Sequence, residues 1–236
     1  MIIIEGEKIV GKKTPYIFVI EGLDGSGKET TTKKLYDILT EDGYKVLTVS
    51  FPMYDKWHSF LVRWFLKGKF GKSPYSVPPR IASLFYSFDR IIGYYTKVKS
   101  IIKNYDFVIF DRYSTSNMLY QGAKGKTYED KISISNFIEF IEHKLFRIPK
   151  PNRVFVLISD SKSSREAMSN RKELDINERD INYQGEVEQF LHTLISLKNW
   201  DPIATRKFNS SNEWYPPEII ANSIYDLWKE KIKKNK

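Results

Sequence analysis

The sequence predicts one α/β domain in which a five-stranded parallel sheet is covered by helices on both faces. Apolar, β-prone runs alternate with helix-prone segments along the 236 residues, and this order builds parallel sheets. The polar motifs follow the ends of the predicted strands, where open sheets of this kind bind ligands. No Pro/Gly/Ser-rich linker divides the chain, so we expect a single domain over residues 1–236.

The elements follow from hydrophobic periodicity. Residues 1–16 form an extension before the first core strand. The apolar runs predict strands at residues 17–20, 46–51, 107–110, 154–158 and, more weakly, 203–208. The segments between them predict helices from the first loop to Gly43 and at 59–66, 80–103, 114–121, 128–146, 187–197 and 217–232.

The helix at 80–103 is the longest predicted helix. Apolar residues recur along it at three- and four-residue steps, which indicates a buried stripe. This stripe consists of Ile81, Leu84, Phe85, Phe88, Ile91, Ile92, Tyr95 and Val98. We expect Ser83, Arg90, Tyr94 and Lys97 on the opposite side, with Tyr86 at the edge of the stripe.

Composition excludes several classes of protein. There is no cysteine, so disulfides and thiolate metal sites are excluded, and no run of about 18 apolar residues could cross a membrane. The short apolar start lacks the basic region of a secretory signal, which favours the cytoplasm. The net charge of +9 comes from scattered lysines apart from the tail at 229–236, so we expect polyanionic small molecules rather than nucleic acid as ligands.

Residues 17–28 carry the strongest functional signal. A strand leads into a GxxxxGK loop and a helix follows, which is the context that makes this pattern a phosphate-binding site. Curled backbone N–H groups and the start of the helix attract phosphate, and Lys28 adds a full positive charge. The predicted ATP-binding residues are Gly22, Leu23, Asp24, Gly25, Ser26, Gly27, Lys28, Glu29 and Thr30.

The residue after the lysine departs from the usual pattern. Glu29 stands where Ser or Thr normally holds Mg²⁺. Either Glu29 contacts the metal, directly or through water, or it turns outward and Thr30 replaces it. Asp111, at the end of the third strand, is a further predicted Mg²⁺ residue.

Polar residues continue after Asp111. Arg112 offers a planar fork that suits a phosphate. Ser116 and Tyr120 are four residues apart and share one helix face, and so do Asn117 and Gln121.

Four motifs together resemble the thymidylate kinases. They are GLDGSGK at 22–28, FP at 51–52, FYSFDR at 85–90 and DRYSTSNMLYQG at 111–122. The resemblance implies a P-loop kinase fold with a mobile lid at about 160–182. It also implies transfer of the γ-phosphoryl group of ATP to dTMP, with Mg²⁺, in a homodimer.

The resemblance implies a role for each matching residue of the acceptor site. Asp24 would bind the deoxyribose 3′-OH, Phe51 would pack near sugar and base, and Tyr86 would stack on thymine. Arg90 would bind a carbonyl edge of the base, and Arg112 would hold the dTMP phosphate. The remaining predicted contacts to dTMP come from Ser116, Tyr120 and Gln121.

The resemblance also implies where the catalytic charge comes from. Position 25 is glycine, so the lid should supply the catalytic arginine. Arg171 is the first candidate, followed by Lys172 and Arg179. Lys28, Arg112 and Arg171 would stabilise the transferring phosphoryl group, with Asp111 as a further catalytic residue.

One departure and two alternatives accompany this interpretation. The arginine that often follows the FP pair is replaced by Met53 and Tyr54, and Lys56 is a possible substitute. A related kinase could accept dUMP, dCMP or a deoxynucleoside. The second alternative is a P-loop switch protein that does not phosphorylate a second nucleotide. The Tyr86–Arg90 pair argues against it, because a switch needs no second nucleotide pocket.

Overall fold

The computed structural model describes residues 2–4, 7–9, 14–159, 164, 174–207 and 213–234. Its centre is a five-stranded sheet in which every neighbouring pair is parallel, in the order β4-β5-β3-β6-β7. The strands are β3 (Tyr16–Gly22), β4 (Val46–Ser50), β5 (Phe107–Asp111), β6 (Arg153–Ile158) and β7 (Asp201–Ala204). The predicted α/β fold with a five-stranded parallel sheet is confirmed.

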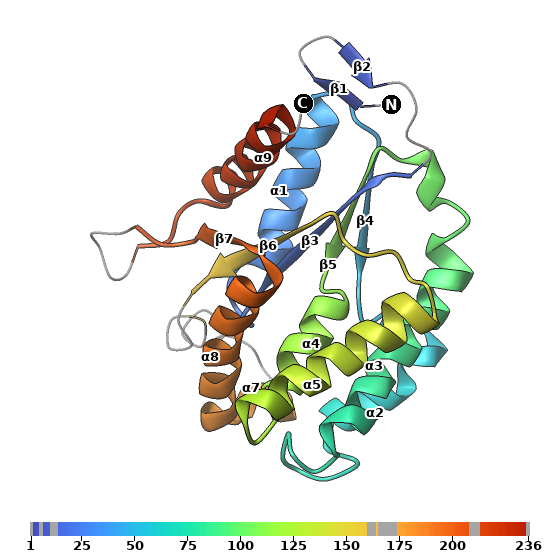
Figure 1. Cartoon of the computed structure of the whole chain (residues 1–236), viewed down its shortest axis with the longest axis vertical. Coiled ribbons are helices and arrows are strands. Elements are labelled where there is room, and N and C mark those ends of the chain that lie inside the picture. The colour runs from blue at the N-terminus through green and yellow to red at the C-terminus, as the bar shows by residue number, and fades with distance from the viewer. Residues whose placement is uncertain are drawn as a thin grey trace.

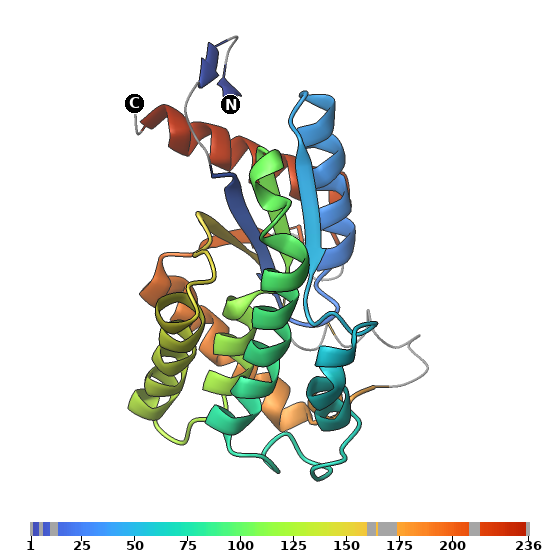
Figure 2. The same ribbon diagram turned by 90° about the vertical axis from the view of Figure 1, so that its right-hand side faces the viewer.

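Helices cover both faces of the sheet (Figures 1 and 2). One face carries α1 (Lys28–Glu41) and α9 (Pro217–Lys234), whose apolar residues surround Trp228. The other face carries α3 (Pro79–Gly93), α4 (Ser114–Gly122) and α8 (Ile181–Lys198), with α5 (Tyr128–Glu139) packed on α4. No helix in the described part of the chain is long and apolar enough to cross a membrane.

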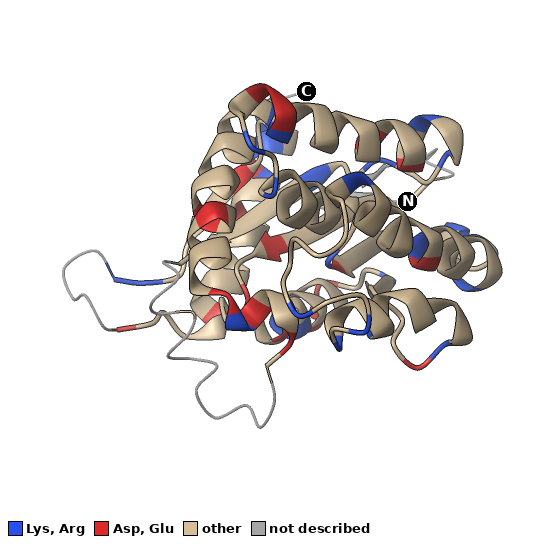
Figure 3. Ribbon diagram, turned by 90° about the horizontal axis from the view of Figure 1, so that it is seen from below, with Lys and Arg blue, Asp and Glu red and all other residues tan. Residues whose placement is uncertain are grey.

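Smaller elements complete the described residues. The predicted extension contains two antiparallel strands, β1 (Ile2–Ile4) and β2 (Glu7–Ile9), which form a sheet of their own. The short helices are α2 (Phe60–Leu66) and α7 (Ile176–Arg179), with a 3₁₀ turn at Trp57–Ser59 before α2. Basic and acidic residues are interspersed over the helices (Figure 3). The assignment of the whole chain to one domain stays a prediction.

The predicted burial of the long helix is largely wrong. Its regular part ends at Gly93, and a wider π-helical turn (Tyr94–Val98) follows. Four members of the expected buried stripe are exposed: Ile81, Leu84, Phe88 and Tyr95. Three residues expected on the opposite side are buried: Ser83, Arg90 and Tyr94.

The reason for this reversal is that the inner face of α3 lies against neighbouring polar groups and a tightly packed loop. Small residues permit that approach, since a Cβ at Gly93 would lie 2.9 Å from the Met53 sulfur. Polar residues on the same face form buried hydrogen bonds, described below. The predicted helix 128–146 is present, as α5 to Glu139 and then as a π-helical segment (Phe140–Leu145) that continues it.

Candidate functional site

The loop between β3 and α1 has the curled backbone that its sequence predicts. Gly25 and Gly27 have φ of 86° and 87°, in the left-handed region that glycine adopts readily. Gly22 is required for a second reason, because a Cβ there would lie 2.8 Å from the Leu157 carbonyl oxygen of the neighbouring strand. Glycine at these positions therefore lets the loop lie close to the sheet.

Lys28 turns back onto this loop. Its Nζ donates to the carbonyl oxygens of Gly22 at 2.9 Å and Leu23 at 2.7 Å, and it lies 3.8 Å from Asp24 Oδ1. The side chain is buried. The loop itself thus fixes the position of the lysine charge.

The residues predicted to hold Mg²⁺ separate into two groups. Glu29 and Asp111 line one cavity between α1 and the ends of β4 and β5. Thr30 Oγ1 instead donates to the Gly27 carbonyl oxygen within the helix, at 2.9 Å. Among the described residues, no cluster of three or more His, Cys, Asp or Glu side chains forms a ready-made metal site.

Asp111 is suited to bind a cation. Burial raises the pKa of its carboxyl group, while the Lys28 charge acts to lower it. Its Oδ1 atom is buried and has no hydrogen-bond partner among the described residues. A buried carboxylate oxygen without a partner is energetically costly, and a Mg²⁺ ion or its water shell would satisfy it.

A second cavity, of about 300 Å³, lies beside the loop and under α3 and α4. All eight residues that the sequence assigned to the acceptor nucleotide line it: Asp24, Phe51, Tyr86, Arg90, Arg112, Ser116, Tyr120 and Gln121. They come from the β3–α1 loop, the residue directly after β4, α3 and the β5–α4 segment. The fold therefore gathers residues that are up to 97 positions apart in sequence (24 to 121) around one space.

The loop end of this cavity carries Arg112. This residue has φ of 62°, which is strained for a side chain other than glycine. One guanidinium nitrogen bonds to Asp24, and the Tyr120 hydroxyl donates to the other oxygen of Asp24 at 3.0 Å. Asp24 thus connects the phosphate loop with the guanidinium predicted to bind the acceptor phosphate.

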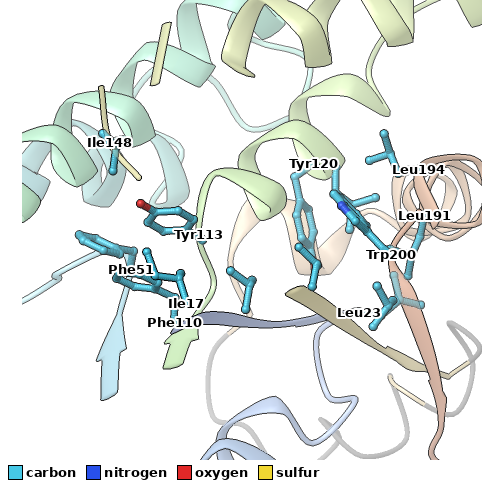
Figure 4. Close-up of a cluster of buried hydrophobic side chains, with 14 of the residues drawn as sticks. Ile17, Leu23, Phe51, Phe110, Tyr113, Tyr120, Ile148, Leu191, Leu194 and Trp200 are labelled. Atoms are coloured by element: carbon cyan, nitrogen blue, oxygen red, sulfur yellow. The ribbon is translucent and has the colours of Figure 1, made fainter. Parts of the chain in front are cut away.

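Arg90 also lines this cavity. Its Nε donates to Glu142 Oε2 at 2.7 Å, and both side chains are buried. The guanidinium lies 5.4 Å from the Phe51 ring centre and 5.6 Å from that of Tyr113. Figure 4 shows Phe51, Phe110 and Tyr113 packed together. An ion pair with Glu142 and two aromatic rings therefore fix the orientation of Arg90.

Asn117 is a site residue that sequence reasoning missed. Its Nδ2 donates to the Ser83 carbonyl at 3.0 Å and to Glu142 Oε1 at 3.1 Å. Both partners are acceptors, which fixes the amide so that Oδ1 is the free acceptor. Oδ1 is buried with no partner among the described residues, and Asn117 lines the cavity. The sequence did contain a signal for it, because Asn117 shares a helix face with Gln121, which was predicted to contact dTMP.

Two further predicted residues are held by partners that the sequence did not reveal. Ser116 donates to Glu21 at 2.7 Å. Gln121 Oε1 accepts from Lys124 Nζ at 2.9 Å, which leaves the buried Nε2 without a partner among the described residues. Burial lowers the pKa of Lys124 to about 7, although the charge of Asp175 acts to raise it.

The loop after β4 also contributes to the cavity through Tyr54, where an arginine was expected. Buried Asp89 on α3 holds this loop. It accepts from the Met53 N–H at 3.0 Å, lies 2.7 Å from His58 Nδ1, and bonds to the Ser59 hydroxyl. Lys56 forms an ion pair with Asp55 and is absent from the lining of the cavity.

The lid prediction falls mostly on residues that the structure does not describe. Arg171 and Lys172 lie outside the described residues. Arg179 ends α7, is exposed, and is absent from the lining of the cavity. Asp175 and Glu178 at the start of this short helix do line it. The position of the catalytic arginine stays a prediction.

Comparison with known proteins agrees with this geometry. The family model described as thymidylate kinase matches residues 20–210. A probable thymidylate kinase of Caldivirga maquilingensis is 28% identical over 92% of this chain and 95% of its own length. The thymidylate kinase of Mycobacterium tuberculosis is 29% identical over 73% of this chain and 79% of its own length.

Proposed function

The chain belongs to the thymidylate kinase family, and from this premise we propose that it transfers the γ-phosphoryl group of ATP to dTMP by means of the two adjoining sites described above. ATP lies on the loop at residues 22–28, and dTMP occupies the cavity of about 300 Å³. Asp24 belongs to both sites, because it follows β3 in the loop and bonds to Arg112. The two phosphates would therefore meet beside Asp24.

One observation supports the acceptor assignment above the others. Asn117 lines the same cavity as Arg90, and its amide is fixed so that Oδ1 is an acceptor without a partner among the described residues, while the Arg90 guanidinium is a fixed donor. Thymine has an N3–H donor next to a carbonyl acceptor and matches this pair. Cytosine has an acceptor at N3 and an amino group beside it, so it would leave buried groups unpaired.

On the donor side, Lys28 and the loop N–H groups would bind the β- and γ-phosphates. Asp111 and Glu29 would hold Mg²⁺, directly or through water. The ion would neutralise charge on the ATP phosphates. Thr30 is a weaker candidate, because its hydroxyl is already used by the Gly27 carbonyl.

The acceptor is already an anion, so the transfer needs positioning and charge neutralisation more than a strong base. Arg112 would hold the dTMP phosphate, and a lid arginine, Arg171 first, would reach the transferring group as the lid closes. Tyr54 supplies a hydroxyl in the cavity where an arginine was expected.

The test is an ADP-release assay with ATP, Mg²⁺ and a panel of monophosphates. We expect dTMP to give the highest kcat/KM and dCMP to fall at least about 10²-fold below it. A preference for dCMP, or turnover only with deoxynucleosides, would contradict the assignment. Tight nucleotide binding without phosphorylation of any monophosphate would favour the switch alternative.

We further propose that two copies pair through the outer face of α3. Ile81, Leu84 and Phe88 are 49%, 38% and 37% exposed there, and Trp57, packed on Phe88, is 68% exposed. Such a contiguous apolar face is unusual on a monomer. Sedimentation velocity should show a dimer that Leu84→Glu converts to monomer, whereas Ile219→Glu, at an exposed site on α9, leaves it intact. The cytoplasmic location stays a prediction.

A further inference from the structure

Glu21 is a buried carboxylate near the end of β3, with an exposed fraction of 0%. An ionised group in such a place needs hydrogen-bond donors. It accepts from the Gly22 N–H at 3.1 Å, Thr115 Oγ1 at 2.8 Å and Ser116 Oγ at 2.7 Å. One donor begins the phosphate loop, and the other two lie in the first turn of α4.

The chain is held on both sides of Arg112. Upstream, β5 is fixed by its pairing with β3, in which Asp111 lies opposite Ile20. Downstream, Thr115 and Ser116 fix the start of α4 on Glu21. The left-handed conformation of Arg112 is unfavourable for a residue with a side chain and persists only when the chain on both sides holds it.

The aromatic neighbour of Arg112 supports the same conclusion. The Tyr113 ring stacks on Phe110 with ring centres 4.2 Å apart, and its hydroxyl donates to the Pro149 carbonyl at 2.9 Å. Figure 4 shows Tyr113 packed beside Phe110 and Phe51, and Tyr120 directed from α4 toward the sheet. The turn is therefore held by apolar packing on one side and by the Glu21 carboxylate on the other.

We propose that Glu21 is a positioning residue for the phosphoryl transfer. It holds the first turn of α4 against the first residue of the phosphate loop and so sets the distance between the Arg112 guanidinium and the donor phosphates. This inference rests on the proposed function. Glu21 itself touches neither substrate and acts through Gly22, Thr115 and Ser116.

The inference is tested with Glu21→Gln, Thr115→Val and the double variant. The first keeps the size of the side chain, and the second removes one donor at a residue that does not line the acceptor cavity. The readouts are kcat and KM for dTMP, the Kd for ADP, and the urea midpoint. Ser135→Ala is the matched control, because Ser135 is equally buried but donates to the Met118 and Lys131 carbonyls instead.

Each single variant should lower kcat/KM for dTMP about 10- to 100-fold, because misplacement by about 1 Å can cost that much. The Kd for ADP should stay within about two-fold. The double variant should be no worse than Glu21→Gln alone, since both changes break the same contact. Ser135→Ala should lose stability but keep the kcat/KM of the wild type.

Two results would overturn the inference. One is a kcat/KM within two-fold of the wild type in variants whose urea midpoint falls as in Ser135→Ala. The other is full additivity of the two losses. If Glu21→Gln does not fold, Thr115→Val decides alone. Failure of the wild type and of Ser135→Ala to phosphorylate dTMP would instead contradict the proposed function.

Discussion

The phosphate loop and the acceptor cavity lie side by side, yet they are built in different ways. The loop is one continuous segment at residues 22–28, and its shape depends on backbone conformation and on glycine. The cavity is lined by side chains from six separate parts of the chain. Several of those side chains are held by buried partners outside the cavity, such as Glu142 and Glu21. Substitutions in the loop should therefore remove charge that stabilises the phosphates. Substitutions around the cavity should instead move the side chains that bind dTMP.

The largest effect should follow Lys28→Ala. This change removes a charge held over the loop by the Gly22 and Leu23 carbonyls. We expect kcat to fall on the order of 10²–10³-fold, as for loss of a well-aimed donor. Calorimetric binding of dTMP should change little, because Lys28 does not line the acceptor cavity. A nearly normal kcat in Lys28→Ala would contradict the assignment of the loop to the ATP phosphates.

Asn117→Ala should give the next largest effect, on the cavity side. Losing Oδ1 removes the acceptor proposed for N3–H, so kcat/KM for dTMP should fall about 10- to 100-fold. The preference for dTMP over dCMP should shrink in the same assay. Asn136→Ala is the control, because Asn136 is exposed on α5. Equal losses for dTMP and dCMP would show that Asn117 does not read the base.

Asp89→Asn tests whether dTMP binding depends on the buried side chains that hold the wall of the cavity. Asp89 accepts from the backbone of Met53 and from two side chains of the loop that carries Tyr54. We expect a loss of about 1–3 kcal/mol in the free energy of unfolding, together with a higher KM for dTMP. Asp55→Asn, in the same loop but 71% exposed, should leave both unchanged. An unchanged KM for dTMP would show that the loop that carries Tyr54 does not contribute to dTMP binding.

The smallest effect on turnover concerns Lys124, whose amine donates to the Gln121 side-chain oxygen and whose role shows mainly in stability. Burial lowers the pKa of this amine from 10.5 to about 7. Between these values the unfolded chain binds more protons than the folded one, so stability should rise with pH from 7 to 10. Relative to Lys124→Met, the wild type should gain about 3 kcal/mol in the free energy of unfolding over this interval, measured by urea unfolding. If the free energy of unfolding changed with pH in the same way in the wild type and in Lys124→Met, the lowered pKa of Lys124 would be contradicted.

The sequence was most informative where function depends on neighbouring residues. The loop at 22–28 and the segment at 111–122 could be identified because strand, motif and helix follow one another directly. Glu21, Asp89 and Asn117 were missed as structural or binding groups, because their partners lie 25 to 95 residues away. Periodicity identified the apolar stripe of α3 but could not tell core from surface, since both faces of this helix carry a regular pattern. No short-range rule could distinguish these cases.

The most direct test of the whole account is a crystal structure with a bisubstrate mimic, in which adenosine and thymidine are joined through a polyphosphate. We expect its phosphates on the loop at 22–28, with the N3–H of thymine on Asn117 Oδ1 and a thymine carbonyl on Arg90. Arg112 should contact the phosphate nearest thymidine. A thymine ring bound outside the cavity, or a polyphosphate that does not reach Lys28, would contradict the account.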